Sequence, residues 1–299
     1  MPEEYYPPVD THLVSSRHVA QTFKIQVMQP VQQRGESSSF PVVYATDGNL
    51  TFDMLKGISH ILQGTGTDAP RFILVGIGYP GESPMAGAIL RGRDFCFEGY
   101  PRFLRQRPPL QDVAMPEEGT KQFYGGEDFQ AFIADELIPM IDAKYRTTSG
   151  DRTYFGHSAG GGFGLYTLLR RPALFRNYIV SSPGLVFHGT SSAGIDYDRY
   201  DFALEETRRF IASGQPLDGR RLYLSVGTEE EFETALANWQ LTSSCCRLAA
   251  LLKAAALPGL ELRSETFAGE THATVWPLAF MHGIQAVFGV GRWRSGAPR

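Results

Sequence analysis

A serine between two glycines could act as a nucleophile in this chain. Residues 156–160 read Gly-His-Ser-Ala-Gly, which matches the G-x-S-x-G nucleophile elbow. In that motif a tight strand-to-helix turn exposes the serine hydroxyl. The flanking residues fit this reading, because Thr153–Phe155 reads as a strand and residues 161–166 read as the start of a helix. We therefore expect Ser158 to be a nucleophile and the amide of Ala159 to face the reacting carbonyl oxygen. The alternative is a glycine-rich turn with an idle serine.

A serine hydroxyl needs a base to become reactive, and a histidine is the usual one. The histidines after Ser158 are His188, His272 and His282. His272 follows the strand-like run Leu260–Phe267 across a short turn, where the base of a hydrolase is expected. We expect His272 to be the base. His282 reads as a packing or surface residue of the last helix, and His188 could contact a substrate.

Three consecutive glutamates could supply the acid that orients the base. Glu229, Glu230 and Glu231 follow the strand-like run Leu222–Val226, between the serine and the histidine in chain order. Their alternative role is that of solvated acids at a helix N-terminus. We expect Glu230, three residues after Gly227, to hold the imidazole tautomer, with Glu229 as the next choice.

The oxyanion of an acyl-transfer reaction needs a second amide besides that of Ala159. Residues 44–49 read Tyr-Ala-Thr-Asp-Gly-Asn and follow the first core strand. Gly48 would let the backbone turn close to a substrate, and the amide of Asn49 could then pair with that of Ala159. An ordinary Asp-Gly turn is the alternative.

Short apolar runs alternate with helical patterns and predict the elements that position these residues. The expected strands are Gln21–Met28, Val42–Ala45, Phe72–Ile77, Thr153–Phe155, Tyr178–Val180, Leu222–Val226 and Leu260–Phe267. The expected helices are Phe52–Leu62, Asp128–Tyr145, Gly160–Leu169, Leu236–Ala256 and Pro277–Phe288. This alternation predicts an α/β fold with a mostly parallel sheet and helices on both faces. Because no linker is visible, we expect residues 1–299 to form a single domain.

Two segments do not follow this alternation of strands and helices and are expected to be irregular. Residues 79–124 combine few apolar runs with many Pro, Gly and Arg residues, and residues 182–200 are similar. We expect 79–124 to be an insertion on the substrate side. Its arginines are Arg91, Arg93, Arg102, Arg105 and Arg107. They could bind an anionic ester through charge-assisted hydrogen bonds, or form a solvated basic loop.

Composition excludes several classes of protein. The 299 residues carry a formal net charge of −4, which argues against nucleic-acid and anionic-membrane partners. No apolar run approaches the roughly 18 residues of a membrane span, and the first residues are acidic where a signal peptide needs bases. The three cysteines have no zinc spacing, and an odd count with an adjacent pair is a poor disulfide framework. We expect a cytoplasmic protein without metal or other cofactor.

Taken together, the motifs resemble a known family. The segments Y-A-T-D-G-N, L-R-G-R-D-F, F-G-H-S-A-G-G-G-F and E-T-H-A-T-V occur in the order typical of the “Putative esterase” family of α/β-hydrolases, which includes siderophore esterases. The resemblance covers residues 15–290. It implies an α/β-hydrolase fold and metal-free hydrolysis of carboxylic esters by Ser158, His272 and an acid near Glu230. Arg91 or Arg93 matches the basic position near the site of the siderophore esterases.

These inferences lead to one expected function and several alternatives. We expect hydrolysis of a small-molecule ester through an acyl-enzyme, with a siderophore trilactone as the leading substrate. Trp276 could contribute an aromatic wall to the site, or could belong to the core. The alternatives are a general or feruloyl-type esterase, an acyltransferase, and a non-catalytic binding protein on the same fold.

Overall fold

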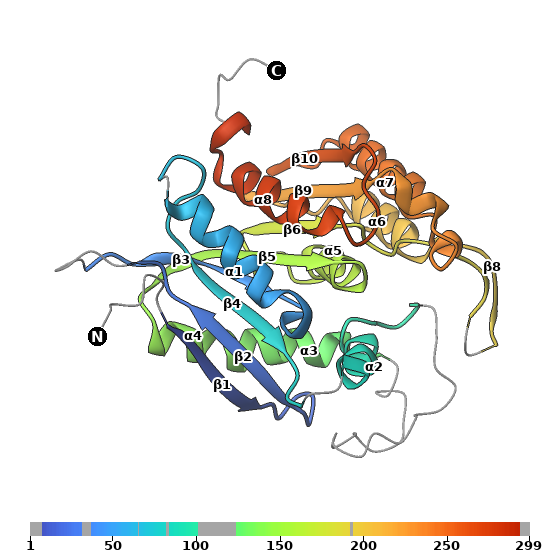
Figure 1. The fold of residues 1–299 in the computed structure, drawn as a ribbon. Coiled ribbons are helices and arrows are strands. Elements are labelled where there is room, and N and C mark those ends of the chain that lie inside the picture. Colours follow the sequence, from blue (N-terminus) through green and yellow to red (C-terminus); the bar gives the residue numbers. More distant parts are fainter. Residues whose placement is uncertain are drawn as a thin grey trace.

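An eight-stranded sheet organises the chain in the computed structural model, which describes residues 8–31, 37–64, 66–81, 84–100, 124–191 and 194–293 (Figure 1). The strands of this sheet are β1 (Val9–Ser15), β2 (Thr22–Met28), β3 (Phe40–Ala45), β4 (Ile73–Gly78), β5 (Thr147–His157), β6 (Asn177–Ser181), β9 (Arg220–Gly227) and β10 (Leu260–Phe267). Their spatial order is β1-β2-β4-β3-β5-β6-β9-β10. β2 pairs antiparallel with β1 and β4, and all other pairs are parallel. The predicted mostly parallel sheet is therefore confirmed.

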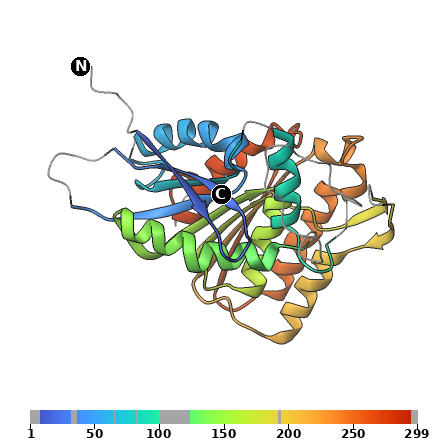
Figure 2. The same cartoon turned by 90° about the horizontal axis from the view of Figure 1, so that it is seen from below.

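Helices cover both faces of the sheet (Figures 1 and 2). α1 (Gly48–Gly64) and α8 (Val275–Phe288) pack on one face. The elements on the other face are α3 (Gly126–Phe132), the π-helical turn η2 (Ile133–Leu137), α4 (Ile138–Lys144), α5 (Ala159–Arg170), α6 (Phe202–Ser213) and α7 (Leu241–Ala255). In the described ranges no helix is both long and apolar enough to cross a bilayer.

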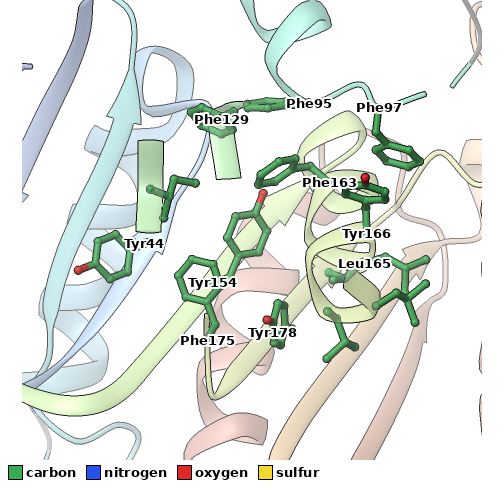
Figure 3. Close-up of a cluster of buried hydrophobic side chains, with 14 of the residues drawn as sticks. Tyr44, Phe95, Phe97, Phe129, Tyr154, Phe163, Leu165, Tyr166, Phe175 and Tyr178 are labelled. Atoms are coloured by element: carbon green, nitrogen blue, oxygen red, sulfur yellow. The ribbon is translucent and has the colours of Figure 1, made fainter. Parts of the chain in front are cut away.

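The continuous apolar runs of the sequence follow from this layering. Val42 and Tyr44 of β3 belong to the cluster under α5, whereas Val43 and Ala45 belong to the cluster under α1 and α8. Neighbouring strand residues point to opposite faces, so a strand covered on both faces is apolar at every position. The cluster under α5 is largely aromatic around Tyr154 of β5 (Figure 3). The ring centroid of Tyr154 lies 5.4 Å from that of Phe175, 6.0 Å from that of Phe163 and 6.5 Å from that of Tyr178.

The connections of β3 and β5 create a site at one edge of the sheet. The two strands are parallel neighbours. β3 leads into α1 on one face, and β5 leads into α5 on the opposite face. Ligands of open α/β sheets bind outside the carboxyl ends of the strands at such a switch point. The segments directly after the two strands, 46–49 and 158–160, therefore lie together where a ligand is expected.

The expectation that residues 79–124 and 182–200 are irregular was wrong in part. Residues 84–94 form helix α2 (Pro84–Asp94), and residues 187–200 contain the hairpin of β7 (Phe187–Thr190) and β8 (Asp196–Tyr200). Helix and strand patterns are weak in both because Pro, Gly and charged residues interrupt them. Three of the five arginines singled out above lie outside the described residues: Arg102, Arg105 and Arg107.

Three other expectations about the elements need correction. The single helix predicted over 236–256 is broken at Gln240, whose φ is +45°, between the 3₁₀ turn η4 (Ala237–Trp239) and α7. The helix predicted over 128–145 is continuous but contains the π-helical turn η2. Strand β1 was not expected, although it pairs with β2 over its whole length. A further 3₁₀ turn, η5 (Gly291–Trp293), follows α8.

Candidate active site

Ser158 occupies the bend between β5 and α5. Its backbone has φ +57° and ψ −124°, a strained conformation for a residue with a side chain, and such strain is typical of functional sites. A Cβ at Gly156 would lie 2.3 Å from the carbonyl oxygen of Gly160, and a Cβ at Gly160 would lie 2.6 Å from Oγ1 of Thr46. Gly156 therefore has no room for a side chain, and a side chain at Gly160 would displace the hydroxyl of Thr46. The bend has the geometry that the G-x-S-x-G pattern predicts.

His272 lies on the loop between β10 and α8 and contacts Glu230. Its Nδ1 lies 2.5 Å from Oε2 of Glu230. Because a carboxylate can only accept, Nδ1 carries the proton and Nε2 is left as a proton acceptor. Glu230 is fully buried, and its Oε1 accepts hydrogen bonds from Oγ of Ser182 (2.7 Å) and from the amide of Gly227 (2.6 Å). These donors stabilise a buried charge that would otherwise be costly.

The three consecutive glutamates point to different partners. Glu231 accepts hydrogen bonds from the amide and the hydroxyl of Ser243, at 2.9 and 2.8 Å, in the first turn of α7. Glu229 accepts a hydrogen bond from the hydroxyl of Thr228 at 3.1 Å. Glu230 is the one whose carboxylate meets the imidazole. They follow β9 in the 3₁₀ turn η3 (Glu229–Phe232), which directs successive side chains to different sides.

His157 connects the elbow to the histidine loop. Its ring lies 4.3 Å from that of His272 and stacks on Trp276, also at 4.3 Å. Since His157 directly precedes Ser158, this packing brings the His272 loop to the elbow. Burial, together with the nearby charges of His272 and Arg91, holds the pKa of His157 well below its ordinary value. His157 is therefore a neutral packing residue at physiological pH, and half-buried Trp276 supports it from α8.

Two helix N-termini meet at the switch point. Gly48 and Asn49 begin α1, and Ala159 begins α5. The first amides of a helix have no partner within the helix, so those of Asn49 and Ala159 can bind an anion. The side chain of Asn49 is fixed, because its Nδ2 donates to the carbonyl oxygen of Tyr79 (2.6 Å) and its Oδ1 accepts from the amide of Tyr79 (2.5 Å). This clamp holds the start of α1 against the end of β4.

The two arginines singled out from the sequence form ion pairs. Arg91 donates from Nε and Nη2 to the two carboxylate oxygens of Asp47, at 2.5 and 3.0 Å, and 21% of its side chain is exposed. Arg93 donates to Asp94 and is only 6% exposed. Arg93 is therefore held in the interior beside Asp94, whereas Arg91 borders the loop between β3 and α1. The substrate contacts expected of both arginines stay predictions.

The remaining histidines have other partners. His188 on β7 lies 3.0 Å from Nε2 of Gln240 and 3.5 Å from a carboxylate oxygen of Asp201. His282 in α8 lies 3.1 Å from Glu265 of β10. Neither ring contacts Glu230 within the part of the chain that the structure describes. His282 is thus a packing residue, as the sequence indicates.

Sequence reasoning missed several residues around the candidate base. Ser182 follows β6 and holds the second oxygen of Glu230, and Glu233 accepts a hydrogen bond from the amide of His272 at 2.6 Å. Asp47 holds Arg91. No local pattern identifies these residues, since each acts on a partner at least 39 positions away.

Comparisons with known proteins agree with this architecture. A family model described as “Putative esterase” matches residues 16–286. The chain is 29% identical over 279 residues to the ferri-bacillibactin esterase BesA of Bacillus subtilis, covering 91% of this chain and 86% of that protein. It is also 29% identical over 229 residues to a siderophore enterobactin esterase of Emericella nidulans, covering 70% and 66% of the two chains. The structure of the siderophore hydrolase EstA from Aspergillus nidulans aligns with a TM-score of 0.74 at 21% identity, covering 97% of each chain, which shows the shared fold.

Proposed function

We propose a mechanism and a substrate class for this chain from the premise that it belongs to the “Putative esterase” family and is therefore an enzyme acting on esters. The mechanism is that of a serine hydrolase. Ser158 is the nucleophile, His272 is the base and Glu230 is the acid that orients it. The contact of 2.5 Å between Glu230 and Nδ1 of His272, on a loop packed against the elbow, carries this proposal.

The reaction has two halves. In the first half, Nε2 of His272 takes the proton of the Ser158 hydroxyl while Oγ of Ser158 attacks the ester carbonyl carbon. The amides of Ala159 and Asn49 bind the resulting oxyanion, and the ionised Glu230 stabilises the imidazolium. His272 then gives its proton to the leaving alcohol, which leaves an acyl group on Ser158. In the second half His272 activates a water molecule in the same way, and the carboxylic acid is released.

The substrate that we propose is a siderophore ester, with a ferric trilactone as the first candidate. One similar relative is named as a ferri-bacillibactin esterase and another as a siderophore enterobactin esterase. Arg91, whose side chain is 21% exposed, borders the oxyanion loop and could attract an anionic iron complex. Trp276 supplies an aromatic surface beside His157. We place the reaction in the cytoplasm, a location supported by the free thiols of Cys96, Cys245 and Cys246.

The alternatives within the same chemistry are a general or feruloyl-type esterase and an acyltransferase. All of them share the acyl-enzyme and differ in the acyl group or in the molecule that accepts it. The position of Ser158 on the elbow and the contact between His272 and Glu230 are compatible with each of these reactions. Substrate comparison, rather than the site geometry, therefore distinguishes them.

Two experiments test the proposal. A fluorophosphonate probe should label the wild-type protein at Ser158 and should not label Ser158→Ala; a folded wild-type sample that resists labelling would contradict the mechanism. Hydrolysis of a ferric catecholate trilactone should then be compared with that of short aryl esters. A kcat/KM at least about ten-fold higher for the iron complex, or roughly 1.4 kcal/mol of transition-state preference, supports the siderophore substrate. Equal values would favour a general esterase.

A further inference from the structure

A second glutamate lies against His272 besides Glu230. Oε1 of Glu233 accepts a hydrogen bond of 2.6 Å from the backbone amide of His272. Glu233 directly follows the 3₁₀ turn η3 (Glu229–Phe232), three positions after Glu230, and its backbone is extended. This short segment therefore directs two carboxylates to one histidine, one to its ring and one to its main chain.

The hydrogen bond that Glu233 accepts from His272 complements the other contacts of the histidine loop. Backbone hydrogen bonds attach the start of that loop to the segment after β9. The amide of Thr228 donates to the carbonyl oxygen of Phe267 (2.9 Å), and the amide of Glu229 donates to that of Glu270 (3.0 Å). Thr271 and Thr274, one on each side of His272 in the chain, hydrogen-bond to each other. These contacts fix the ends of the loop. The hydrogen bond to Glu233, in contrast, is donated by the backbone amide of His272 itself.

We propose that Glu233 is a positioning residue for the base, an inference that rests on the proposed function of His272. Its hydrogen bond fixes the main chain from which the imidazole reaches Ser158. Its charge also adds to that of Glu230 and favours the imidazolium that forms as the serine loses its proton. A displacement of the base by about 1 Å can cost two orders of magnitude in rate, so a bond that fixes its backbone matters for catalysis.

Few charged or titratable groups that the structure describes lie close enough to His272 to change how its activity depends on pH. Glu230 and Glu233 approach from η3 and its end, and Glu270 precedes His272 by two residues. On the other side lies His157, whose pKa is held well below its ordinary value by burial and by the charges of His272 and Arg91. Glu233 is thus one of the few negative charges whose removal would act on the base without breaking its contact with Glu230.

Three variants separate the hydrogen bond from the charge. Glu233→Ala removes both, whereas Glu233→Gln keeps an oxygen that can accept from the amide of His272. Glu231→Gln is the matched control, because Glu231 lies in the same turn but bonds to Ser243 of α7. Each variant is assayed with a neutral aryl ester for kcat and KM between pH 5 and 9. Thermal unfolding is measured in parallel.

The expected results differ between the variants. For Glu233→Ala we expect kcat to fall by about ten- to fifty-fold while KM stays within about two-fold, since Glu233 acts on the base and not on the substrate. For Glu233→Gln we expect kcat within about three-fold of wild type, and an acidic limb of the kcat/KM profile displaced to lower pH. The sign follows because losing a negative charge disfavours the imidazolium, so the base stays neutral at lower pH. Glu231→Gln should change neither quantity.

Wild-type kcat and an unshifted pH profile in both Glu233 variants would overturn the inference. If Glu233→Ala does not fold, the Gln variant still decides, because its pH profile reports the charge. The Ser158→Ala variant separates this failure from failure of the proposed function. Activity remaining in Ser158→Ala would contradict the nucleophile, whereas loss of activity there with unaffected Glu233 variants contradicts only the role of Glu233.

Discussion

The hydroxyl of Ser182 donates a hydrogen bond of 2.7 Å to Oε1 of Glu230, the oxygen that does not face His272. Ser182 is fully buried and has a φ of +44°, a conformation that few residues with a side chain adopt. Together with the amide of Gly227 it occupies one oxygen of the carboxylate and leaves Oε2 for the imidazole. The orientation of the base thus depends on a residue from a different strand than the acid.

Replacing Ser182 by alanine should weaken both folding and catalysis. The buried carboxylate would lose one of its donors, and a hydrogen bond to a charged group contributes roughly 1.5–3 kcal/mol. We expect the melting temperature to fall and kcat/KM to drop by about ten-fold with an aryl ester. Ser213→Ala is a matched control, because that hydroxyl bonds to the end of α6. An unchanged kcat/KM in folded Ser182→Ala would show that Gly227 alone suffices.

Glu230→Gln tests the acid directly. The amide of glutamine cannot favour the tautomer with the proton on Nδ1 as a carboxylate does, and it cannot stabilise an imidazolium. We expect kcat to fall by about three to four orders of magnitude, as for removal of the charge in comparable triads. Glu229→Gln, whose carboxylate bonds to Thr228, should stay within about two-fold of wild type. Comparable losses in the two variants would contradict the assignment of the acid.

Local patterns predicted much of the fold and the elbow. The apolar runs of β3, β4, β6 and β9 follow from their burial on both faces, and the glycines around Ser158 follow from the space available there. A strand-turn-helix pattern needs only neighbouring residues to be recognised. That is why the bend at Ser158 and the position of the histidine loop were predictable.

Features that depend on distant partners were not predictable. The break at Gln240 and the hairpin of β7 and β8 are stabilised by tertiary contacts, which can override local propensity. The choice among three glutamates depends on which side of a 3₁₀ turn faces His272. The ion pairs of the arginines were not predictable either. The sequence does not show that Arg91 pairs with Asp47 and Arg93 with Asp94, so both arginines were expected to bind substrate.

Arg91→Ala distinguishes two roles of this side chain. Arg91 holds Asp47, and therefore the loop that begins α1, but part of its surface remains exposed. If it also attracts an anionic substrate, kcat/KM should fall by about ten-fold more for a ferric catecholate trilactone than for a neutral aryl ester. Equal losses for both esters would mean that Arg91 acts through Asp47. The salt dependence of KM for the anionic ester checks the same charge, since screening weakens the attraction.

Glu265 provides a prediction about stability that is independent of the active site. Burial alone would raise the pKa of Glu265, but hydrogen bonds from His282, Tyr223 and Arg292 outweigh it and lower the pKa to about 2. A carboxyl group with a lowered pKa stabilises the folded state above its unfolded value, near 4.5, and loses that contribution as the pH falls toward 2. Because the cluster is partly exposed, we expect the contribution to be about 1 to 2 kcal/mol.

Glu265→Gln should therefore lower the free energy of unfolding at pH 7, and the difference from wild type should shrink between pH 4.5 and the lowest pH at which the protein stays folded. Denaturant unfolding at pH 7, 5, 4 and 3 measures this trend. The control is Glu205→Gln in α6, whose exposed pair with Arg208 should contribute less than about 0.5 kcal/mol. The kcat/KM of Glu265→Gln should match wild type at pH 7, because the contacts of Glu265 lie on β9, α8 and η5 rather than at the elbow. A difference that grows as the pH falls would contradict the lowered pKa.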